Sequence, residues 1–78
     1  MKPYILKVTE YESGTTYYSL WEYNTGCLDN RRFTTCNLEK AKRGVVLYTK
    51  GNTNAVVRVP HELVSEFKNL SAAKIESY

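Results

Sequence analysis

The side chains that could act as a nucleophile or a general base in this sequence are one histidine and two cysteines. His61, Cys27 and Cys36 lie in no motif that pairs a thiol with a base. The cysteines do not form a C-x-x-C pair, and a zinc site would need two further ligands at short spacing. The carboxylates are dispersed, and the glycines fit neither nucleotide-binding glycine motif. The sequence therefore predicts a protein that is not an enzyme and that holds no metal and no cofactor.

The same cysteines bear on the compartment. Small secreted domains usually carry four or more cysteines, because disulfides replace a core that is too small. This chain has two, and its start, Met1 to Tyr4, lacks the apolar stretch of a signal peptide. The longest apolar run, Val45 to Tyr48, is far shorter than the ~20 residues that span a bilayer. We expect a cytoplasmic protein, no membrane partner, and two reduced thiols of which one or both are buried. A disulfide across two strands is the alternative.

Aromatic side chains are the strongest sign of a binding surface. They make up 13% of the 78 residues. Five of them fall between residues 11 and 23, namely Tyr11, Tyr17, Tyr18, Trp21 and Tyr23. In a β-strand, Tyr17, Trp21 and Tyr23 share one face, because side chains alternate between the two faces. That face either belongs to the core or forms an exposed platform for a protein partner or for unstacked bases.

Basic residues are concentrated in the middle of the chain, although the net charge is only +3. Residues 31–58 contain a single carboxylate, Glu39, and the following cations: Arg31, Arg32, Lys40, Lys42, Arg43, Lys50 and Arg58. Such a segment either forms a patch that attracts phosphates or an acidic protein surface, or scatters its charges over several faces.

The elements that must position these residues form one small α+β domain spanning residues 1–78. Alternation and turn residues predict an N-terminal meander with strands at 4–11, 15–23 and 31–36, and a second hairpin with strands at 45–49 and 55–59. We therefore expect an antiparallel sheet of about five strands.

Two helices complete the predicted fold. Asn37 and Gly44 have the residue types of a helix N-cap and a helix end, which predicts a short helix over 38–43 after the third strand. The alternative extends this helix to Tyr48, because Leu38, Ala41, Val45 and Tyr48 lie at the spacing of one helical face. Pro60 begins the main, C-terminal helix, whose apolar stripe should be buried on one face of the sheet: Leu63, Val64, Phe67 and Leu70. The residues expected opposite are Leu6, Val8, Leu20, Val57 and Val59.

Two functions of different classes fit these features. The first is a small non-catalytic protein-binding module or inhibitor that contacts a larger protein or protein complex through an aromatic and basic sheet surface. The expected contact residues are Tyr17, Trp21, Tyr23, Arg31, Arg32, Lys40, Lys42 and Arg43. In size and composition the chain is similar to the small proteins with which phages and mobile elements block host machinery, anti-CRISPR and anti-restriction proteins among them, although no motif carries this resemblance.

The alternative is a nucleic-acid-binding domain that combines a basic patch with stacking aromatics. The position of the basic residues separates the two functions. Clustering of these cations on the aromatic face would favour nucleic acid, and scatter would favour a protein partner.

Overall fold

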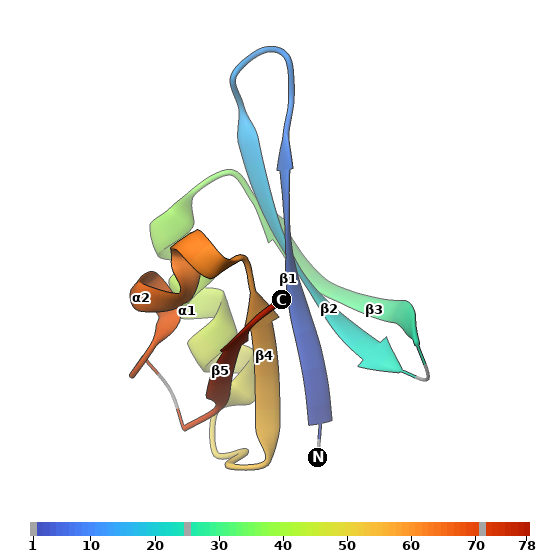
Figure 1. Cartoon of the computed structure of the whole chain (residues 1–78), viewed down its shortest axis with the longest axis vertical. Coiled ribbons are helices and arrows are strands. Elements are labelled where there is room, and N and C mark those ends of the chain that lie inside the picture. Colours follow the sequence, from blue (N-terminus) through green and yellow to red (C-terminus); the bar gives the residue numbers. More distant parts are fainter. Residues whose placement is uncertain (1, 25, 71) are drawn as a thin grey trace.

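The computed structural model describes residues 2–24, 26–70 and 72–78, which form one five-stranded sheet and two helices (Figure 1). The strands are β1 (Lys2–Glu10), β2 (Thr16–Asn24), β3 (Cys27–Thr35), β4 (Ala55–Val59) and β5 (Lys74–Ser77). The helices are α1 (Leu38–Thr49) and α2 (Val64–Phe67), and a 3-10 turn, η1 (His61–Leu63), precedes α2. None of the described helices is long and apolar enough to cross a membrane.

The sheet is mixed, with the strand order β3-β2-β1-β4-β5. The first three strands form the predicted antiparallel meander. The two remaining strands pair in parallel, β4 with β1 and β5 with β4. The expectation of a purely antiparallel sheet is therefore wrong, because β4 and β5 each follow a crossover that returns them in the direction of β1.

Helix α1 replaces the first strand of the predicted second hairpin. Asn37 caps it as expected, since its side-chain oxygen accepts a hydrogen bond from the Lys40 amide at 3.0 Å. The helix does not end at Gly44 but continues to Thr49, so the alternative of a longer helix is confirmed. Ala41 and Val45 are fully buried, and burial of this face outweighs the low helix propensity of glycine and the paired valines.

The main helix is α1, so the prediction of a main C-terminal helix is wrong. Helix α2 is a single turn, and the backbone leaves it with Asn69 at a φ of 69°. Phe67 is fully buried as expected, whereas Leu70 lies beyond the helix and is 39% exposed. The chain then adds β5, which the sequence analysis did not predict.

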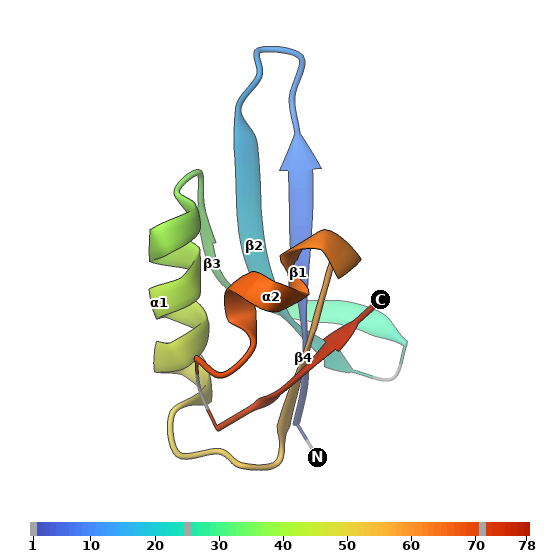
Figure 2. The same ribbon diagram turned by 60° about the vertical axis from the view of Figure 1, so that its left-hand side comes forward.

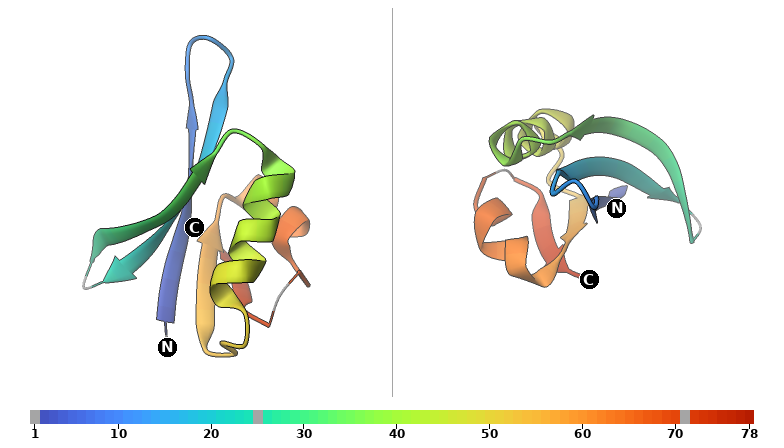
Figure 3. Two further views of the ribbon diagram at one scale, coloured as in Figure 1. Left: turned by 180° about the vertical axis from the view of Figure 1, so that it is seen from behind. Right: turned by 90° about the horizontal axis from the view of Figure 1, so that it is seen from above.

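The core lies between one face of the sheet and the two helices (Figure 2). Leu6, Leu20, Val57 and Val59 are fully buried there as predicted, and Val8 is partly buried. Both helices lie on the same side of the sheet (Figure 3). The opposite face, which has no helix over it among the described residues, is called the open face below.

Candidate binding surface

The aromatic residues of β2 divide between the two faces of the sheet as alternation predicts. Leu20 pairs with Leu6, and both are fully buried beneath the helices. Tyr17 and Trp21 pair with Thr9 and Ile5, which have the opposite orientation. The open face therefore carries the three aromatic residues proposed for binding: Tyr17, Trp21 and Tyr23. Tyr17 is 39% exposed, and the other two are half-buried.

Arg31 joins these aromatics, whereas Arg32 does not. Arg31 lies beside Trp21 in the β2–β3 ladder, and its guanidinium carbon is 5.8 Å from the centroid of the indole. The two arginines are neighbours in β3, so their side chains lie on opposite faces of the sheet, and a shift of register in this ladder sets which of them lies beside Trp21. Arg32 instead binds the Glu22 carboxylate at 2.7 Å and lies 6.0 Å from the Tyr48 ring on the helix side.

A hollow of about 450 Å³ lies over β1, β2 and β3 on the open face. Its residues combine aromatic walls, hydroxyl groups and two cations: Lys7, Thr9, Tyr11, Tyr17, Ser19, Trp21, Leu28, Arg31 and Thr34. Tyr11 and Tyr17 meet edge to face, with ring centroids 5.4 Å apart. The hydroxyls of Ser19 and Thr34 are hydrogen-bonded to each other at 2.8 Å. This hollow can receive a partner side chain between Trp21 and the tyrosines.

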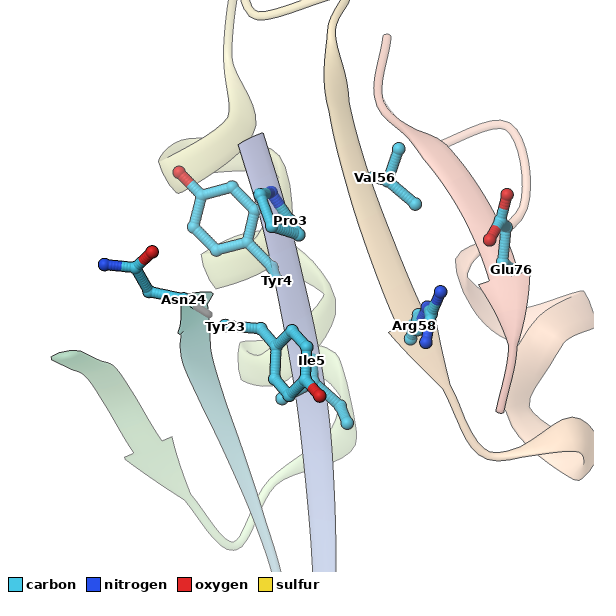
Figure 4. A pocket seen from close by; sticks show the side chains of 8 residues that line it. All are labelled: Pro3, Tyr4, Ile5, Tyr23, Asn24, Val56, Arg58 and Glu76. Carbon is cyan, nitrogen blue, oxygen red and sulfur yellow. The ribbon is translucent and has the colours of Figure 1, made fainter. Parts of the chain in front are cut away.

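A second hollow, of about 410 Å³, lies farther along the open face over β1, β4 and β5 (Figure 4). Pro3, Ile5 and Val56 supply apolar surface, and Arg58 extends beside them. Tyr23 borders this hollow from the β2 side. The two hollows give the open face concave sites, which can accept side chains of a folded partner.

Tyr78 extends the aromatic surface past the end of β5. Its hydroxyl donates a hydrogen bond to the carbonyl of Leu6 at 3.0 Å, and the Lys7 ammonium is 5.9 Å from its ring. Burial raises the pKa of the Tyr78 phenol, and the charge of Glu62 adds to this effect. This shift favours the protonated phenol, which is the form that donates the hydrogen bond.

The basic residues of α1 lie away from the aromatics. Lys40, Lys42 and Arg43 belong to the helix on the other side of the sheet. The Lys42 ammonium lies 3.0 Å from Glu66 and 3.3 Å from Glu39. The hydrogen bond to Glu66, with that to Glu39, raises the pKa of Lys42. Of the proposed contact residues, the structure thus brings together Tyr17, Trp21, Tyr23 and Arg31, and it separates Arg32 and the three cations of α1 from them.

The open face also contains residues that the sequence analysis did not select. Lys7 and Arg58 are exposed, and each lies between buried or half-buried neighbours of its strand. The same period-two alternation that selected Trp21 could have placed both of them on the open face. Tyr78 could not have been found in this way, because its position depends on the unpredicted strand β5.

The residues first considered for catalysis do not form a site. His61 is exposed at the start of η1, and Cys27 and Cys36 are exposed and free. The expectation that one or both thiols are buried is therefore wrong. In the described ranges, histidines, cysteines and carboxylates form no group that could hold a metal ion.

Comparison of the chain with protein-family models, with curated proteins and with solved structures finds no match. A function for this protein therefore has to rest on its own residues.

Proposed function

We propose that this protein is a small non-catalytic module that binds a larger protein through the open face of its sheet and inhibits that protein by occupying its surface. The observation that carries the proposal is the hollow between Tyr17 and Trp21, on a sheet face that neither helix covers. A host defence complex is the partner class that we expect from size and composition.

The residue types on this face suit a protein interface. Tryptophan, tyrosine and arginine are the residues that most often dominate binding energy at such interfaces. Trp21 is held by its neighbours in the sheet, and Arg31 stacks over it, so that little side-chain freedom is lost on binding. Trp21 is only half-buried in the free protein, which leaves part of the indole available to a partner.

The distribution of charge favours a protein over a nucleic acid. Of the seven basic residues in the segment 31–58, only Arg31 and Arg58 lie on the open face. Arg32 is paired with Glu22, and the remaining cations belong to α1 or its C-cap. A nucleic-acid surface would need these cations beside the aromatics to contact successive phosphates.

The test is capture of a partner from host lysate with the tagged full chain, with and without nuclease treatment. We compare the parent, the double variant Tyr17→Ala/Trp21→Ala, and the control Lys68→Glu, which changes an exposed residue at the end of α2. The expected result is a single enriched protein that resists nuclease, is retained by Lys68→Glu, and is lost with the double variant. Thermal melts of each variant establish that the loss does not come from unfolding.

Nuclease-sensitive capture would contradict the proposal and favour the nucleic-acid alternative. Equal capture by the double variant and the parent would exclude the open face as the contact surface.

A further inference from the structure

Three cations of α1 and its C-cap form an outer stripe together with one leucine. This outer stripe consists of Lys40, Arg43, Leu47 and Lys50. Their spacing places them on one side of the helix and its C-cap, opposite the buried face of Ala41 and Val45. Over these residues the stripe extends for about 15 Å.

Leu47 is the unusual member of the outer stripe. It is 66% exposed, the largest exposed fraction among the large hydrophobic residues described. Val46, which precedes it in the chain, and Leu70 border a hollow of about 300 Å³ between α1 and the chain that follows α2, together with Arg43 of the outer stripe. An exposed leucine next to such a hollow gives the helix surface an apolar centre that folding does not use.

Most of the charge around this centre is positive, and Glu39, the carboxylate that borders the hollow, is paired with Lys42. Lys42, at the edge of the hollow, already has two carboxylate partners. By contrast, the described residues supply no ion pair to Lys40, Arg43 or Lys50. Three free cations therefore surround one exposed leucine, and the complementary surface has carboxylates around an apolar side chain.

From this arrangement we infer that the outer stripe of α1 is a second binding surface, and that its partner is an acidic amphipathic helix of another protein. A helix laid along α1 can place carboxylates at i, i+3 and i+10 spacing, the spacing of Lys40, Arg43 and Lys50, while its apolar side chains meet Leu47. A nucleic-acid backbone has phosphates but no apolar counterpart for Leu47. A membrane surface would require a wider apolar face than one leucine and the hollow at its side.

This inference does not depend on the proposed function, because α1, which carries the outer stripe, lies on the side of the sheet opposite the open face (Figure 3). If both surfaces are used, the protein can hold two partners at once.

The test is titration of the 15N-labelled full chain with synthetic helical peptides, followed by NMR. The probe carries glutamates around a leucine stripe, and its matched control has glutamine in place of each leucine. We expect the probe to shift the amides of Arg43, Leu47 and Lys50, and the control peptide to bind at least about tenfold more weakly. Leu47→Asp and Arg43→Glu should each weaken binding of the probe peptide by a similar factor.

Two further variants separate this surface from other effects. Lys68→Glu makes the same charge change as Arg43→Glu but lies outside the outer stripe, and it should bind the probe peptide as the parent does. Trp21→Ala should also bind the probe peptide as the parent does, even if this variant no longer binds the partner of the open face.

Three results would overturn the inference. In the first, the probe peptide does not shift the amide signals of the outer stripe. In the second, the leucine-free control peptide binds as tightly as the probe. In the third, the protein binds single-stranded DNA or phosphatidylserine vesicles more tightly than it binds the probe.

Discussion

Gly44 shows how one missing side chain brings α1 close to the sheet. A Cβ atom at this position would lie 2.6 Å, 2.9 Å and 3.0 Å from three atoms of the Phe33 ring. That ring is stacked on Tyr48, with centroids 6.0 Å apart, so it cannot move without disturbing a second contact. The glycine that the sequence suggested as a helix end is therefore a point of close approach between helix and strand.

Gly44→Ala should for this reason destabilise the protein. In an unobstructed helix, alanine would stabilise by about 1 kcal/mol relative to glycine. Here we expect a net loss of about 1 kcal/mol, because overpacking of this kind costs about 1–3 kcal/mol. Urea unfolding measures the difference. In a Phe33→Leu background the same substitution should no longer be destabilising, and a gain in stability in the parent background would contradict the close contact.

Phe67 and Leu70, which the sequence placed on one stripe, should respond differently to truncation. Phe67 is fully buried and Leu70 is 39% exposed. Phe67→Ala should cost about 3–5 kcal/mol, which is enough to unfold a domain of this size. Leu70→Ala is the matched control and should change the melting temperature little. Similar melts for the two variants would show that Phe67 is not the residue that anchors α2.

At the scale of elements, Glu22 connects three strands on the helix side of the sheet. Its carboxylate lies 2.7 Å from Lys2 of β1 and 2.7 Å from Arg32 of β3. The hydrogen bond from Lys2, with the charges of Arg32 and Lys2, holds the pKa of Glu22 below its ordinary value of 4.5, although burial opposes this shift. A carboxyl whose pKa is lowered by folding stabilises the protein above its unfolded pKa and loses this effect as the pH falls through the folded value.

Glu22→Gln should therefore lower the free energy of unfolding at neutral pH. The difference in free energy of unfolding between parent and variant should narrow as the pH falls below about 4.5. Urea midpoints at pH 7 and at pH 3 measure the gap. Glu12→Gln, in the exposed turn between β1 and β2, serves as the control and should change the urea midpoint little. A gap for Glu22→Gln that is the same at both pH values would show that the carboxylate charge is not responsible.

Strand β3 keeps the two thiols apart. Cys27 begins the strand and Cys36 follows its last residue, and nine residues at about 3.3 Å each correspond to roughly 30 Å along a straight strand. A disulfide needs Cα atoms within about 7 Å. Both thiols should therefore react with iodoacetamide in the folded protein, and mass spectrometry of the untreated monomer should show no loss of two hydrogens. An intramolecular bond would require β3 to be broken.

The elements that were predicted correctly are those whose patterns depend on near neighbours. Alternation in β2 assigned Trp21 and Leu20 to opposite faces, because their environment is set by the adjacent strands of the meander. The side chain of Asn37 likewise marks a helix start through a contact only three residues away. The shared face of Tyr17, Trp21 and Tyr23 follows from this local information.

The errors arise where distant segments decide the structure. Gly44 and the following valines resemble a helix end and a strand, and only the packing of Val45 against the sheet makes them helical. Residues 74–77 form a strand because β4 lies beside them, and their own pattern is too short to show it. Arg31 and Arg32 are neighbours in one strand and lie on opposite faces, and only the register shift between β2 and β3, which has no signature in the sequence, decides that Arg31 lies beside Trp21.

At the scale of the whole molecule, the net charge of +3 is spread over both sides of the sheet. On the open face, Lys74 is paired with Glu76 at 3.3 Å. The cations left for a partner there are Lys7, Arg31 and Arg58. Even if all three contacted the phosphates of a single strand, the log–log slope of affinity against salt would be only about −2.

We therefore expect binding through the open face to depend on aromatic burial more than on charge. For the captured partner, Trp21→Ala should weaken affinity by about 2 kcal/mol or more, while Arg31→Gln should act mainly through the association rate. The log–log slope with salt should stay smaller in magnitude than about 1, because few charges are neutralised. Surface plasmon resonance over a range of salt concentrations measures all three quantities. A slope steeper than about −2, with Arg31→Gln more damaging than Trp21→Ala, would require cations from beyond the open face, and the contact would then have to extend to the helix side of the sheet.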